Sequence, residues 1–147
     1  MPPFADALAL YGALFFIGLT VGAMGVFGAG VAPVVFRVLC EEKAGPVIRS
    51  IFPIYYLVLA VTPGLAAVAG FLINVAAGLV LVVIAGGFLF ARQVMMPRIN
   101  ALRDEIKRGS TAAKGPFDMM HAWSVRMNML QLIVLVLVFW FLALSVS

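Results

Sequence analysis

The chain has 147 residues, of which 65% are hydrophobic and 11% are charged, with a net charge of +4. Soluble domains are about 45–50% hydrophobic and about 25% charged, so this chain has too few polar side chains to cover a water-soluble globule. Its mean hydropathy of +1.16 and its single cysteine also exclude disorder and a disulfide-stabilised scaffold, so we expect one all-α integral membrane domain, a four-helix bundle over residues 1–147.

The first uncharged stretch covers residues 7–36 and predicts a membrane span over about residues 8–32. Small residues recur on one face of this span, where they would let another helix approach closely. These predicted packing residues are Gly18, Gly22, Gly25 and Ala29. Pro33 near the end of the span predicts a kink or break around Gly28–Pro33, with residues 34–39 running along the inner membrane surface.

The next uncharged stretch, residues 50–91, is 42 residues long. A helix needs about 20 apolar residues to cross a bilayer, so this stretch predicts two crossings joined by a tight turn. We expect the second span at about residues 50–69 and the third at about 75–96. Gly70 and Asn74 are the expected turn residues, because glycine commonly ends a helix and asparagine commonly caps one.

A charged segment follows the third span. Pro97 predicts that the span ends or bends there. Beyond it, Ile99, Leu102 and Ile106 repeat at helical spacing, opposite a charged face. The sequence therefore predicts a short amphipathic helix on the cytoplasmic membrane surface, closed by Gly109.

The fourth span is expected at about residues 120–145 and carries a polar stripe. Its members are His121, Ser124, Asn128 and Gln131, spaced so that they share one helical face. Polar side chains in a membrane helix are costly when they face lipid, so the stripe should face the bundle. It predicts either hydrogen bonds between helices or a shallow polar pocket open to the cytoplasm, to which Tyr55 of the second span would contribute.

The basic residues predict the orientation. All ten lie in or beside the first and third connections, and none precedes the first span, occurs in the second turn or follows the fourth span. Because cytoplasmic loops carry an excess of basic residues, we expect an N-out/C-out protein with both charged connections in the cytoplasm. This predicts a multi-pass protein of the inner (plasma) membrane, with the lipid bilayer as partner and no nucleic-acid partner.

An ordered set of motifs resembles a known family. The set runs from the glycine-rich first span through Ala32-Pro33-x-x-Phe36, Ala44-Gly45, Phe52-Pro53, Tyr55, Pro97, Phe117 and His121-x-x-Ser124-x-x-x-Asn128. In this it is similar to the transmembrane protein 205-like family of bacterial and eukaryotic four-helix membrane proteins, whose bacterial members form a domain of unknown function. The resemblance covers nearly the whole chain and implies the four-helix fold, but it implies no reaction or ligand.

Catalysis and cofactor binding have little support in the sequence. No paired carboxylate lies within a span, and no Ser/His/Asp set or Cys-x-x-Cys motif occurs, so we expect no enzyme. His121 is an alternative haem ligand, because one axial histidine suffices for some haems. Met119 and Met120 belong to a methionine cluster whose thioethers suit Cu(I). No cofactor or metal is firmly predicted.

Two functions follow from these features. One is the binding of a small ligand or solute in the shallow cytoplasmic pocket. The other is an accessory subunit of a larger membrane complex, for example a redox complex, or a homo-oligomer, which would use the glycine face for docking.

Overall fold

The computed structural model describes residues 4–145, and within that range all regular structure is helical. The first long helix comprises α1 (Phe4–Gly25), the π-helical segment η1 (Val26–Val31) and α2 (Ala32–Val38). The second is α3 (Glu41–Ile73). The third comprises α4 (Val75–Phe90), the π-helical segment η2 (Ala91–Met95) and α5 (Met96–Lys107), and the fourth is α6 (Lys114–Leu144).

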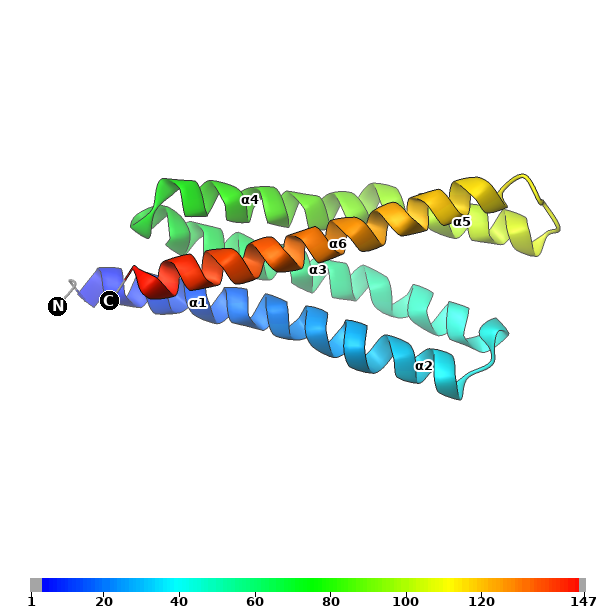
Figure 1. Cartoon of the computed structure of the whole chain (residues 1–147), viewed down its shortest axis with the longest axis horizontal. Helices are drawn as coiled ribbons and strands as arrows, with labels where there is room; N and C mark the ends of the chain where they lie inside the picture. Colours follow the sequence, from blue (N-terminus) through cyan, green and yellow to red (C-terminus); the bar gives the residue numbers. More distant parts are fainter. Residues whose placement is uncertain (1–3, 146–147) are drawn as a thin grey trace.

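These four helices are long and apolar enough to cross a membrane. They lie side by side with alternating directions, so that the start of α1, the end of α6 and the α3–α4 turn share one end of the bundle (Figure 1). The α2–α3 and α5–α6 connections share the opposite end, which we call the charged end. The predicted spans fall within the four helices, apart from Ser145 at the very end of the last span.

The turn between α3 and α4 is short because small residues let the two helices approach closely. Asn74 caps α4, with its side-chain oxygen accepting a hydrogen bond of 3.1 Å from the backbone nitrogen of Ala77, as predicted. Gly70 does not end α3; it lies inside the helix, where a Cβ would come within 3.4 Å of the Gly78 backbone. Its missing side chain therefore serves close packing of the hairpin.

Pro33 was expected to kink or break the first helix and Pro97 to end or bend the third; both helices continue past the proline after a π-helical segment. The backbone nitrogen of Ala32 donates to Phe27 and that of Met96 to Ala91, five residues back in both cases. Each of these wider turns directly precedes a proline, Pro33 or Pro97, whose ring would clash with a carbonyl in an unbroken α-helix. Residues 34–38 and 97–107 therefore continue their helices and are not separate surface helices. Gly109, with a φ of 94°, does follow the last turn, as predicted.

The glycine stripe of α1 does not pack within the bundle. Gly18, Gly22, Gly25 and Ala29 are exposed, and a Cβ at Gly22 or Gly25 would meet nothing within 4 Å. The buried face of α1 is a different one, formed by Ala9, Leu10, Ala13, Ile17, Thr20 and Met24. This corrects the predicted packing: interdigitating side chains, and a hydrogen bond of 2.7 Å between Thr20 and Thr62, join α1 to α3.

Candidate functional site

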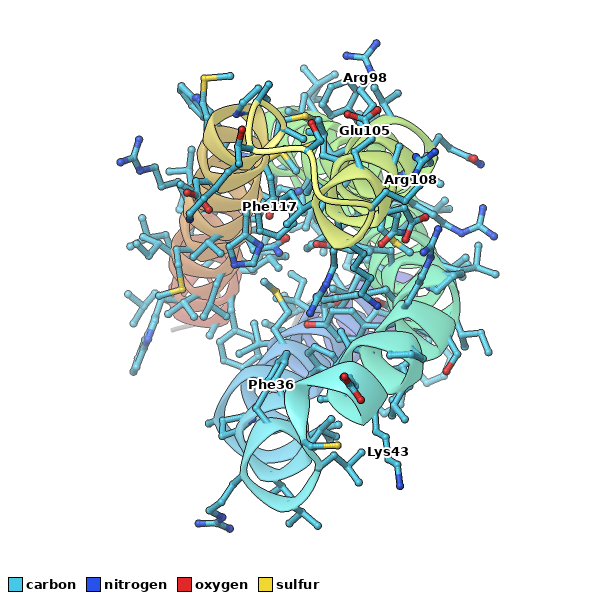
Figure 2. The ribbon with its side chains drawn as sticks, turned by 90° about the vertical axis from the view of Figure 1, so that its right-hand side faces the viewer. Phe36, Lys43, Arg98, Glu105, Arg108 and Phe117 are labelled. Carbon is cyan, nitrogen blue, oxygen red and sulfur yellow. The ribbon has the colours of Figure 1, made fainter. Side chains whose placement is uncertain are left out.

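A cavity of about 840 Å³ lies at the charged end, between α2, α3, η2, α5 and α6. Much of its wall is apolar, including Phe36, Ile48, Phe52, Met95 and Phe117. Figure 2 looks toward this end and shows Phe36 and Phe117 on the inner side, whereas Lys43, Arg98 and Arg108 point outward. The cavity forms where the α2–α3 end of the bundle diverges from the α5–α6 end (Figure 1).

Three residues of the predicted polar stripe, His121, Ser124 and Asn128, line this cavity. The Ser124 hydroxyl donates a hydrogen bond of 2.8 Å to the His121 carbonyl. The Asn128 amide nitrogen donates to the Tyr56 hydroxyl at 2.9 Å, which connects α6 to α3. The Asn128 oxygen Oδ1 is buried and has no hydrogen-bond partner among the described residues.

Gln131 lies one turn deeper and does not line the cavity. Its amide nitrogen donates to the Ile84 carbonyl of α4 at 3.1 Å, and its oxygen Oε1 is buried without a partner among the described residues. Gly87 makes room for it, because a Cβ there would lie 2.5 Å from the Gln131 nitrogen. Gln131 thus acts in the association of α4 with α6, the first of the two readings of the stripe.

Tyr56, and not the predicted Tyr55, lines the cavity. The Tyr55 ring stacks on Phe27 of η1, with 4.3 Å between ring centroids. The Tyr56 side chain is only 5% exposed and stacks on Phe52. Successive helical residues differ by about 100° in direction, so a shift of one residue moves the aromatic hydroxyl to another face.

The metal and haem candidates are three consecutive residues of α6. His121 is exposed and lies parallel to the ring of Phe117, with 5.9 Å between centroids. Met119 is exposed and Met120 half-buried. Among the described residues, no group of three His, Cys, Asp or Glu side chains could hold a metal ion.

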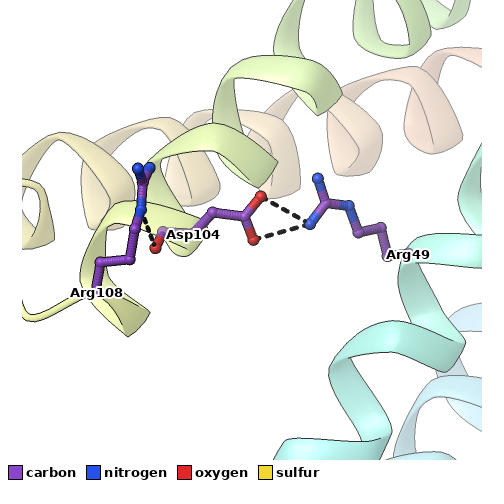
Figure 3. Close-up of polar contacts among 3 residues, drawn as sticks. All are labelled: Arg49, Asp104 and Arg108. Carbon is purple, nitrogen blue, oxygen red and sulfur yellow. Dashed lines mark hydrogen bonds and ion pairs between the residues drawn. The ribbon is translucent and has the colours of Figure 1, made fainter.

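An ion pair that sequence reasoning missed connects two walls of the cavity. Nη1 of Arg49 on α3 lies 2.9 and 3.0 Å from the two carboxylate oxygens of Asp104 on α5 (Figure 3). The guanidinium of Arg108 donates to the Asp104 backbone carbonyl at 3.2 Å. No local pattern could have predicted the pair, because 55 residues separate its members along the chain.

The comparisons with known proteins give one match. The sequence model of the domain of unknown function DUF4149 matches residues 15–108. These residues include the cavity walls from α2, α3 and α5, and they exclude α6 with its polar stripe. No curated protein and no solved structure matches the chain.

Proposed function

Because the DUF4149 match covers more than half of the chain, the chain belongs to this family, and we propose that it binds a small ligand or solute in the cavity at its charged end. The observation that carries the proposal is the cavity of about 840 Å³, whose wall includes the polar side chains of His121, Ser124 and Asn128 from one face of α6. Ligand pockets typically measure about 300–1,000 Å³, so the size suits a small molecule.

The proposal includes an orientation and a narrower kinship. The charged end would face the cytoplasm of an inner (plasma) membrane, since all ten basic residues fall within residues 37–49 and 92–126, the two stretches that contain its connections. The cavity would then be reached from the cytoplasm. The ordered motifs support placing the chain among the transmembrane protein 205-like proteins.

Native mass spectrometry of the protein, released from its own membrane in mild detergent, tests the proposed binding. We expect the wild type to retain a non-protein mass that Ser124→Trp loses, because the indole would fill the cavity. Leu130→Trp is the matched control, since Leu130 is 61% exposed on the same helix and does not line the cavity. A wild type without a bound mass, or the same occupancy in Ser124→Trp, would contradict the proposal.

Asn128→Ala provides a second variant if the larger side chain prevents folding. It removes a polar side chain from the cavity wall and adds no volume. We expect it to reduce retention of the bound mass more than it lowers the unfolding temperature. The opposite pattern would show that Asn128 serves only the hydrogen bond to Tyr56.

A second candidate function is a subunit of a larger membrane assembly or a homo-oligomer. It is favoured by the exposed glycine stripe of α1, where small residues would permit close approach of another helix. Gly22→Leu would obstruct that approach without meeting any atom of the bundle within 4 Å of the new Cβ. A stable assembly in the native extract that dissociates in Gly22→Leu would support this function, and a lone monomer in the wild type would contradict it.

A further inference from the structure

Arg103 of α5 is turned toward the interior at the charged end. Its side chain is half-buried and lines the cavity, in contrast to the exposed Arg98 on the same helix. The guanidinium lies against α3 at Gly45, where an added Cβ would be 3.2 Å from Nη2 and 3.3 Å from Cζ. The absence of a side chain at Gly45 thus provides the space in which the cation lies close to the α3 backbone.

Among the side chains that the structure describes, the guanidinium of Arg103 has no hydrogen-bond or ion-pair partner. The side chain of Glu41 is not among those described. Two other cavity cations are already paired: Arg49 holds Asp104 at 2.9 Å and Lys114 holds Asp118 at 3.0 Å. The remaining charged residues of the wall, Glu42 and Lys107, are exposed.

A guanidinium without a partner among the described side chains favours an anion. Arginine presents a planar set of N–H donors that matches a carboxylate or phosphate, and charge-assisted hydrogen bonds are about twice as strong as neutral ones. A cationic occupant would lie beside the charge of Arg103, since Asp104 and Asp118 already hold cations and Glu42, the other acidic residue of the described wall, is exposed. A neutral occupant could accept a hydrogen bond from Arg103 but would leave its charge uncompensated.

The apolar part of the wall sets a second requirement. Phe36, Ile48, Phe52 and Met95 offer surface that a small hydrated ion would leave uncovered. An apolar body lying on these side chains would release the water that otherwise wets them. The occupant therefore needs both a negative group and an apolar portion.

We propose that the ligand of this cavity is an anionic amphiphile, whose carboxylate or phosphate is held by Arg103 while its apolar body lies on the aromatic and aliphatic wall. This inference rests on the proposed binding function and specifies its ligand class. The same chemistry could come from a bilayer lipid or from a soluble anion, which the experiment separates.

The test uses the full chain in phosphatidylcholine nanodiscs and follows its thermal unfolding during titration with four probes. Decyl phosphate carries both features, decyl maltoside and decyltrimethylammonium lack the negative group, and inorganic phosphate lacks the apolar body. We expect decyl phosphate to bind about tenfold or more tightly than each of the others, the effect of one to two charge-assisted hydrogen bonds. Equal affinity of inorganic phosphate would overturn the amphiphile in favour of a free anion.

Variants of one cation localise the effect. Arg103→Gln should weaken decyl phosphate about tenfold, whereas Arg98→Gln, with the same change in charge at an exposed position, should leave it unchanged. Arg103→Lys keeps the charge and should retain part of the affinity, which guards against a folding defect in the glutamine variant. An equal loss in both glutamine variants would reduce the effect to surface potential and overturn the assignment of Arg103.

The outcome for the ligand class is distinct from that for binding itself. If the maltoside or the ammonium probe binds as tightly as the phosphate, the anionic class is wrong, although the cavity still binds amphiphiles. If no probe binds and the wild type still retains a native mass that Ser124→Trp loses, only the ligand class fails. If that native mass is also absent, the proposed binding function fails with it.

Discussion

The hydroxyl groups of Thr20 and Thr62 join α1 to α3 in the apolar interior and permit a quantitative test of the packing. Their oxygens lie 2.7 Å apart, and the residues are 0% and 6% exposed. Each hydroxyl also lies near the carbonyl four residues earlier, at 2.8 Å from Phe16 and 2.9 Å from Val58. Two protons cannot serve three contacts, so one hydroxyl donates to its own helix and the other donates across the interface.

Thr62→Val removes the interhelical bond and preserves the side-chain shape. Thr20 then donates to the Phe16 carbonyl, so no buried donor is left unpaired. The expected loss of unfolding free energy is therefore that of one interhelical hydrogen bond in a membrane protein, about 0.6–1 kcal/mol. Thr20→Val should cost the same for the same reason.

The double variant distinguishes this arrangement from two independent contributions. Removing the last hydroxyl takes away only a bond to a carbonyl that already has a helical partner. The double variant should thus cost about as much as either single one, with a coupling energy of about 0.6–1 kcal/mol. Additive losses, or a single loss above about 2 kcal/mol, would refute this assignment of the protons.

Reversible unfolding in mixed micelles of mild detergent and dodecyl sulfate, followed by circular dichroism, gives the four free energies. Thr111→Val is the control, because Thr111 is exposed in the α5–α6 connection. A change in the control as large as in Thr62→Val would show that the assay reports hydroxyl loss in general.

Three further predictions concern the polar groups and the orientation. Gln131→Leu should leave the unfolding free energy unchanged or raise it by up to about 1 kcal/mol, because it removes an unpaired buried oxygen along with the bond to Ile84. A loss above about 1 kcal/mol in the same unfolding assay would mean that the oxygen has a partner. Arg49→Gln should cost less than about 1 kcal/mol, since the side chains of its ion pair are 49% and 43% exposed, and a larger loss that persists in concentrated salt would contradict this. An impermeant maleimide should label Cys40, the single cysteine, which is exposed between α2 and α3, only in opened cells. In a cysteine-free background, Ser145→Cys should be labelled in intact cells. The reverse pattern would show that the charged end faces outward.

The helices were predictable because bilayer thickness constrains the sequence directly. A span of apolar residues must lie between charged connections, and the 42 uncharged residues 50–91 can meet this requirement only as a hairpin. Asn74 was predictable because a side-chain cap depends on local geometry alone. Three residues of the polar stripe on α6 line the cavity, and polar residues among apolar ones are the signal that indicates the inward face of a membrane helix.

The buried face of α1 was not predictable in this way. In a soluble helix the apolar face indicates the core, but in a membrane helix the lipid-facing side is equally apolar, so hydrophobic periodicity does not distinguish them. The small residues at Gly18 and Gly22 were a plausible seam, yet Ile17 and Thr20 pack inside instead. The choice between Tyr55 and Tyr56 failed for a related reason, since both tyrosines lie in an aromatic cluster and only helix rotation separates them.

The π-helical segments rotate the following residues about the helix axis, which a helical wheel with a constant angle per residue does not predict. A π turn inserts about one extra residue, which rotates everything beyond it by about 100°. If the third helix were α-helical throughout, its apolar stripe of Ile99, Leu102 and Ile106 would face the cavity. With the π-helical segment η2, Asn100, Arg103 and Lys107 also line the cavity. Pro97 follows this turn, and beyond it polar side chains of α5 join the cavity wall. The phase of α5 thus decides which of its side chains reach the cavity, a link from sequence to site that passes through backbone geometry.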